Sequence, residues 1–247
     1  GVNSPLHGRS AGEIDLVIVR ENAEGEYSQM GGRIYEGTPR EMVIQEAVFT
    51  RQGVDRILRH AFEVASKRAV EKGQKGRVTS ATKSNGIIHT MPYWDERFAA
   101  MAEQFPNIET DQFHIDILSA HFVQHPDWFD VVVGSNLFGD ILSDLGAAVV
   151  GGMGLAPAAN LNPAGEFPSM FEPVHGSAPD IAGKAIANPI AQIWTGAMML
   201  DHLGEVAAAN DLENAIATVL ADGSVRTPDL GGQANTTALA EAVGDAL

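Results

Sequence analysis

Short apolar runs alternate along the chain with longer stretches in which apolar residues recur at helical spacing. The short runs predict strands at residues 15–20, 77–81, 113–118 and 130–134. The longer stretches predict helices at residues 55–68, 92–105, 139–145, 189–203, 211–220 and 236–246. Because strands and helices alternate, the pattern predicts an α/β protein with a largely parallel central sheet.

Two segments depart from this alternation. Residues 24–50 are rich in Gly, Tyr, Thr and Val, and Gly31 and Gly32 lie between two extended pieces, which predicts a hairpin or an arm. Residues 151–170 are rich in Gly and Pro and predict turns. The Gly-rich part of this second segment, residues 151–157, could mark a boundary between two domains.

The composition narrows the classes of protein. The chain has 247 residues, no cysteine and a formal net charge of −16, which excludes disulfides and Cys-ligated metals and disfavours nucleic acid and anionic membranes as partners. Apolar stretches are too short for a transmembrane helix, and we expect a cytoplasmic protein. Residues 98–247 hold Lys184 and Arg226 against 19 acids, so most acids form a solvated surface and a few could bind a cation.

Two carboxylates, Asp140 and Asp144, lie four residues apart after the predicted strand 130–134. On a helix they would share one face and could bind one divalent cation, and oxygen ligands favour magnesium or manganese. An acidic first turn that stabilises the helix dipole explains the same pair equally well.

The segment from Phe171 to Asp180 combines small residues with a carboxylate. Gly176, Ser177 and Ala178 would let a ligand approach the backbone closely, and Asp180 could accept hydrogen bonds from both hydroxyls of a ribose. Because a 2′-phosphate would be repelled there, this interpretation favours NAD over NADP. An irregular surface loop is the alternative interpretation.

Three further residues have side chains suited to catalysis. Lys83 follows a predicted strand beside small polar residues and could act as a base or bind an anion. Arg20 and Tyr27 follow the first predicted strand; a guanidinium suits a substrate carboxylate, and a phenol can donate a proton. Each could equally be an ordinary surface or salt-bridged residue. No zinc-peptidase or α/β-hydrolase motif is present.

Several of these segments resemble the β-decarboxylating dehydrogenases, the family of isocitrate and isopropylmalate dehydrogenases. They follow the family order at residues 19–27, 82–86, 114–117, 136–145, 172–184, 187–189 and 229–232. Residues 25–28, 80–86, 90–96 and 120–130 most resemble the tartrate dehydrogenase/decarboxylase branch, which also acts on D-malate. The resemblance implies a two-lobed isopropylmalate dehydrogenase-like fold that lacks its N-terminal part, because family members carry a further segment before this chain begins.

The resemblance also implies roles for individual residues. Tyr27 corresponds to the acid that protonates carbon after CO₂ leaves, Lys83 to the base for the substrate hydroxyl, and Arg20 to a substrate carboxylate clamp. The metal ligands would be Asp140 and Asp144 of one subunit, with Asp116, like Lys83, reaching in from the partner. The residues that match the NAD site are Glu172, His175, Gly176, Ser177, Ala178, Asp180 and Asn188.

The resemblance further implies a chain of two lobes that forms a homodimer with shared active sites. Residues 1–150 would form the lobe for dimerisation, metal and substrate, with an interlocking arm at about residues 24–45, and residues 151–247 the C-terminal half of the cofactor lobe. The implied cofactors are NAD and Mn²⁺ or Mg²⁺, and the sequence does not decide whether K⁺ is also needed.

The expected function is NAD- and divalent-metal-dependent oxidation of a 2-hydroxy dicarboxylate, tartrate or D-malate, with oxidative decarboxylation of D-malate. Isopropylmalate dehydrogenase activity and an inactive dimerisation fragment are the alternatives. Hydrolase or aldolase chemistry at the Asp pair would leave the loop at residues 172–180 without a purpose. If the chain is the whole protein, we expect an incomplete sheet and little turnover.

Overall fold

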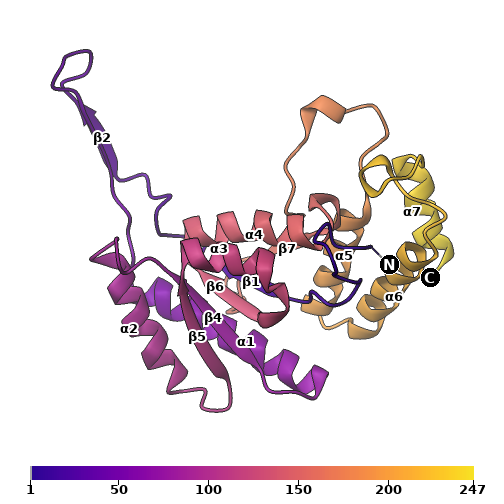
Figure 1. Cartoon of the computed structure of the whole chain (residues 1–247), viewed down its shortest axis with the longest axis horizontal. Coiled ribbons are helices and arrows are strands. Elements are labelled where there is room, and N and C mark those ends of the chain that lie inside the picture. Colours follow the sequence, from indigo (N-terminus) through magenta and orange to yellow (C-terminus); the bar gives the residue numbers. More distant parts are fainter. Residues whose placement is uncertain (1) are drawn as a thin grey trace. The chain divides into compact units, whose positions relative to one another are not determined.

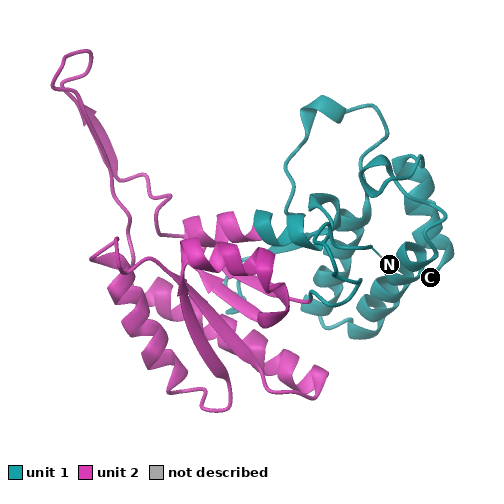
Figure 2. Ribbon diagram, in the orientation of Figure 1, with its two compact units in different colours: residues 1–14, 144–247 teal, residues 15–143 magenta. Residues whose placement is uncertain are grey.

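The computed structural model of the chain describes residues 2–247. It contains two compact units, residues 15–143 and residues 1–14 together with residues 144–247 (Figure 2). The division falls within helix α4 (Asn136–Val150), which begins in the first unit and ends in the second. Each unit has its own buried apolar residues.

The unit formed by residues 15–143 is built on a four-stranded parallel sheet with the strand order β1-β6-β4-β5. The strands are β1 (Val17–Arg20), β6 (Val131–Gly134), β4 (Arg77–Thr82) and β5 (Glu109–His114). The register pairs Arg20 with Gly134 and Thr82 with His114, so neighbouring strands end close to one edge. This sheet confirms the predicted α/β class.

Helices α1 (Arg51–Lys72), α2 (Thr90–Ala102) and α3 (Ile115–Gln124) pack against this sheet. Helix α1 begins where the Thr50 side chain accepts a hydrogen bond from Gly53 N, and it ends at Gly73, which adopts the left-handed conformation at φ 62°. The three consecutive valines of β6 are buried, as expected for a central parallel strand. Together with apolar residues of α1 and α2 they form the core of this unit, which includes Leu58, Phe62, Trp94, Phe98, Val131, Val132 and Val133.

The prediction of a strand at residues 113–118 is wrong. Strand β5 covers Glu109–His114, and the apolar residues that follow belong to α3, in which Leu118 and Phe122 are buried one helical turn apart. Strand β5 lies at the edge of the sheet, so its sequence is mostly polar and lacks the apolar run of a central strand. Asp116 therefore lies in the first turn of a helix.

The predicted hairpin is confirmed. Strands β2 (Gly31–Ile34) and β3 (Met42–Gln45) pair antiparallel, and residues 31–34 and 42–45 are all exposed. Figure 1 shows this two-stranded arm extending away from the sheet of its own unit. A backbone bridge between Gly25 and Val48 closes the base of the arm.

The second unit is mainly helical. Helices α5 (Ile190–His202), α6 (Val206–Asp222) and α7 (Thr236–Asp245) surround a core that includes Leu155, Ile190, Ile216, Leu239 and Val243. A short antiparallel pair, β7 (Pro157–Asn160) and β8 (Met170–Pro173), packs against α5. No helix among the described residues has the length and apolar character needed to cross a membrane.

Candidate active site

The carboxyl edge of the parallel sheet carries four of the residues predicted to act in catalysis, substrate binding or metal binding. Arg20 is the last residue of β1, Lys83 directly follows β4, and Asp116 lies two residues beyond β5. Asp140 lies in the second turn of α4, the helix that follows β6. Ligands of α/β proteins bind beyond the carboxyl ends of parallel strands, so this edge is the candidate site.

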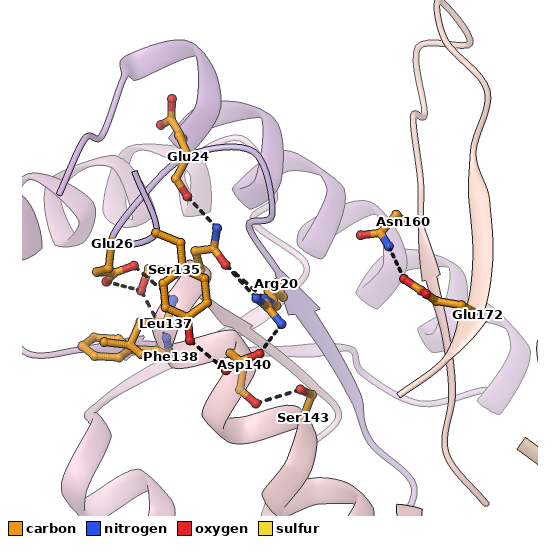
Figure 3. Close-up of polar contacts among 12 residues, drawn as sticks. Arg20, Glu24, Glu26, Ser135, Leu137, Phe138, Asp140, Ser143, Asn160 and Glu172 are labelled. Atoms are coloured by element: carbon orange, nitrogen blue, oxygen red, sulfur yellow. Dashed lines mark hydrogen bonds and ion pairs between the residues drawn. The ribbon is translucent and has the colours of Figure 1, made fainter. Parts of the chain in front are cut away.

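Arg20, Tyr27, Asn136 and Asp140 form one hydrogen-bonded group, called here the Asp140 cluster. Arg20 Nη1 donates to Asp140 Oδ1 at 2.5 Å (Figure 3). Tyr27 Oη donates to Asp140 Oδ2 at 2.9 Å. Arg20 also donates to Asn136 Oδ1 through Nε at 3.2 Å and Nη2 at 2.8 Å. The structure thus brings together three residues proposed as clamp, acid and metal ligand.

Tyr27 is held in this cluster although its side chain is exposed by 51%. The hydrogen bond to Asp140 raises the pKa of Tyr27 above that of a free phenol. Its ring also lies 5.8 Å from the Arg20 guanidinium carbon, within the range of a cation–π contact. At neutral pH Tyr27 therefore carries a proton that it can donate.

Lys83 and Asp116 form a separate ion pair in the same unit. Lys83 Nζ lies 2.7 Å from Asp116 Oδ1, and the Asp116 side chain is 66% exposed. This hydrogen bond from Lys83 holds the pKa of the Asp116 carboxyl below its ordinary value. In one chain the proposed base and the proposed third metal ligand therefore face each other and take no part in the Asp140 cluster.

The proposed metal ligands are not gathered within one chain. Among residues 2–247 no group of three or more His, Asp or Glu side chains is placed to hold an ion. Asp144 is exposed one turn after Asp140 on α4, and both oxygens of Asp140 are engaged by Arg20 and Tyr27. The all-oxygen donor set of Asp140 and Asp144 suits Mg²⁺ or Mn²⁺, provided that a further ligand is supplied from outside the chain.

Two residues that contact the Asp140 cluster or the start of α4 were not assigned a role by the sequence analysis. Asn136 binds the Arg20 guanidinium through its oxygen and the Glu24 carbonyl through Nδ2 at 3.1 Å. Glu26 accepts hydrogen bonds from Ser135 Oγ at 2.7 Å and Leu137 N at 3.1 Å (Figure 3). These contacts join positions more than a hundred residues apart, so local spacing contains no signal for them.

The residues predicted to bind NAD lie in the second unit. Glu172 is in β8 and accepts a hydrogen bond from Asn160 Nδ2 at 3.2 Å (Figure 3). The loop that follows is largely exposed, and Asp180 lies on a short 3₁₀ turn. A Cβ at Gly176 would meet no atom within 4 Å, and Ala178 adopts a left-handed backbone at φ 42°. The loop therefore offers open backbone, together with His175 and Ser177, to a ligand.

Asn188 anchors the end of this loop. Its Oδ1 accepts a hydrogen bond from Ile190 N at 2.9 Å, and its Nδ2 donates to Asp229 Oδ2 at 2.9 Å. Gly154 is required beside them, because a Cβ there would lie 2.9 Å from Asp229 Oδ2 and 3.0 Å from Asn188 Cβ. Asn188 thus ties the first turn of α5 to the segment at Asp229.

Comparison with known proteins identifies the family. The model of the isocitrate/isopropylmalate dehydrogenase family matches residues 1–246. The chain is 60% identical to D-malate dehydrogenase [decarboxylating] of Escherichia coli (strain K12), over 98% of this chain and 67% of that protein. It is 58% identical to tartrate dehydrogenase/decarboxylase of Pseudomonas putida, over 100% of this chain and 68% of that protein.

A solved structure gives the same result. The crystal structure of isocitrate dehydrogenase from Methylococcus capsulatus superposes with a TM-score of 0.87 at 40% identity, covering 100% of this chain and 70% of that one. The chain thus spans about two thirds of the length of the relatives that it matches. It belongs to the isocitrate/isopropylmalate dehydrogenase family, a family of dehydrogenases.

Proposed function

We propose that this protein oxidises a 2-hydroxy dicarboxylate, tartrate or D-malate, with NAD and a divalent metal ion, and decarboxylates D-malate in doing so. The observation that carries the proposal is the Asp140 cluster, in which a carboxylate suited to an ion contacts both a guanidinium and a protonated phenol. The two relatives named for D-malate and tartrate support the choice of substrate.

Arg20 binds a substrate carboxylate. Asn136 Oδ1 accepts from Nε and Nη2 and so fixes the plane of the rigid guanidinium, which keeps Nη1 beside Asp140, where it can donate to a substrate carboxylate that binds there. A guanidinium matches a carboxylate in shape and charge and keeps its charge at any working pH. The same residue therefore binds the substrate and stays attached to α4.

Lys83 and Tyr27 move the protons of the reaction. Lys83, when neutral, accepts the proton of the substrate hydroxyl, and bound NAD would supply the acceptor for the hydride of the carbon that bears it. For D-malate, the bond to the β-carboxyl group then breaks and CO₂ leaves. Tyr27 Oη donates its proton to the carbon that carried this group and is reprotonated from solvent.

The groups that the chain would hold are an ion and a dinucleotide. Asp140 and Asp144 would bind Mg²⁺ or Mn²⁺ together with Asp116 of the partner subunit, in a homodimer to which the partner also brings Lys83. Such an ion stabilises negative charge on the substrate oxygens. The exposed loop from Glu172 to Asn188 would hold NAD, with Asp180 on the ribose hydroxyls.

A substrate panel tests this proposal. We expect the intact protein to release NADH and CO₂ in equal amounts from D-malate with NAD and Mn²⁺, and NADH from tartrate. Preferred turnover of isopropylmalate would show that the substrate is wrong. If calorimetry detected binding of neither NAD nor Mn²⁺ and no substrate were turned over, the protein would be an inactive dimerisation fragment.

The preference for NAD depends on Asp180. The substitution Asp180→Lys is expected to raise the KM for NAD by about 10-fold or more and to shift the relative kcat/KM toward NADP, because a ribose acceptor is lost and a 2′-phosphate is no longer repelled. Asp180 is exposed, so the fold should not change. Asp211→Lys makes the same charge change at an exposed position of α6 and serves as the control. Equal kinetics of the two variants with both cofactors would contradict the ribose contact.

A further inference from the structure

The side chain of Tyr27 has little packing around it. Half of its surface is exposed, and its described contacts are the hydrogen bond to Asp140 and the ring contact with Arg20. A side chain with so little burial can adopt other rotamers unless the segment that carries it is fixed. The position of the phenol therefore depends on what holds the residues beside it.

Glu26, the residue before Tyr27, is bound at the start of α4. Its Oε1 accepts a hydrogen bond from Oγ of the fully buried Ser135 at 2.7 Å, and its Oε2 accepts one from Leu137 N at 3.1 Å. The Leu137 N–H belongs to the first turn of the helix, where it has no intrahelical acceptor, and the helix dipole favours a carboxylate there. Asp140 lies on this same helix one turn later.

The other side of the segment is fixed as well. Glu24 accepts hydrogen bonds from Thr50 N and Thr50 Oγ1, both at 2.7 Å, at the start of α1. Gly25 pairs with Val48 and packs so closely on Asn136 that a Cβ would lie 3.1 Å from the Asn136 Cβ. Of these anchors, Glu26 is adjacent to Tyr27 and contacts the helix that carries Asp140.

We propose that Glu26 is a positioning residue for proton donation by Tyr27, and this inference rests on the proposed function. Its carboxylate fixes the backbone of Tyr27 to α4, so the phenol and Asp140 keep one geometry while the substrate reacts. When the bond to CO₂ breaks, its electron pair stays on the substrate as an enolate, and the enolate carbon takes the proton of Tyr27 Oη in a new C–H bond. A phenol displaced by about 1 Å would transfer this proton roughly 10²-fold more slowly.

This role predicts a loss that is selective for one reaction. Oxidation of tartrate without loss of CO₂ forms no new C–H bond, so it does not need the Tyr27 proton. Decarboxylation of D-malate does need it. A residue that only stabilised the fold or the ion site would affect both reactions to the same degree.

The test compares Glu26→Gln and Glu26→Ala with Tyr27→Phe in the intact protein. Gln keeps the size of Glu, but its NH₂ group replaces one of the two acceptor oxygens. It can therefore not accept from both Ser135 Oγ and Leu137 N in the way that the carboxylate does. For both Glu26 variants we expect kcat for D-malate to fall by about 10- to 100-fold with its KM unchanged, and tartrate oxidation to stay within about threefold. Glu63→Gln, at an exposed position of α1, is the control, and thermal unfolding verifies the fold.

The double variant Glu26→Gln/Tyr27→Phe gives an independent readout. If Glu26 acts through Tyr27, the double variant is no slower with D-malate than Tyr27→Phe alone. Additive losses, or equal losses for both substrates in the Glu26 variants, would overturn the inference, as would wild-type kinetics. If Tyr27→Phe itself showed no selective loss, the acid role in the proposed function would fail instead.

Discussion

Lys83→Met is expected to reduce kcat with both D-malate and tartrate by about 10²- to 10⁴-fold, the range associated with a general base. In the proposed function both reactions begin with removal of the hydroxyl proton, so both should fall together. Methionine has nearly the same length as lysine and lacks the nitrogen that accepts the proton. The variant also removes the hydrogen bond that lowers the pKa of Asp116, so the pKa of that carboxyl should rise toward its ordinary value. Steady-state kinetics with both substrates, and calorimetry to verify that NAD still binds, provide the measurement.

Mixed dimers show which subunit supplies Lys83. In a dimer of one Lys83→Met chain and one Asp140→Asn chain, one site would combine an intact Asp140 with an intact Lys83 if the sites are shared. Random reassortment makes half of the dimers mixed, with one of two sites intact, so about a quarter of wild-type activity should return. If each chain used its own Lys83, every site would contain one substitution and no activity would be recovered.

The substitution Asp140→Asn is expected to weaken Mn²⁺ binding and to reduce kcat/KM by about 10³-fold, because a neutral amide replaces a charged ligand of nearly the same shape. It also replaces the acceptor of Arg20 Nη1 and Tyr27 Oη, so the pKa of Tyr27 should fall toward that of a free phenol. Calorimetric titration with Mn²⁺ measures the first effect without any need for turnover. Asp211→Asn removes the same charge from an exposed position of α6 and should leave the Mn²⁺ affinity unchanged. Equal affinities of the two variants would exclude Asp140 as a ligand.

Local pattern was enough to predict most of the fold. Helix α1 follows from its apolar spacing and from Gly73, and β6 follows from a run of valines. Strand β5 was misplaced because a polar edge strand lacks an apolar run, while the apolar face of α3 directly after it resembles one. The hydrophobic pattern of the sequence identifies the buried elements. A polar edge strand lacks this pattern and is recognised only from its backbone pairing in the structure.

The candidate site likewise contains residues that the sequence identifies and contacts that it does not. Lys83, Arg20 and Asp140 were found from residue type and position after a strand, whereas Asp116 was implied only by the family resemblance. The parallel register places all four along one edge. The contacts of Glu26 with Ser135 and of Asn188 with Asp229 were not predicted, because each depends on how distant segments pack. Such anchors have no fixed spacing from the residues that they hold.

The arm formed by β2 and β3 has a consequence for the thermodynamics of the protein. Its apolar side chains, including Ile34, Met42, Val43 and Ile44, are all in contact with water in a single copy of the chain. An isolated two-stranded ribbon is only marginally stable. If a second copy covers the ribbon, as the proposed homodimer requires, then the fraction of chains with an ordered ribbon depends on the protein concentration. Dilution would melt it before the parallel sheet, and a heat-denaturation midpoint would have a meaning only at a stated protein concentration.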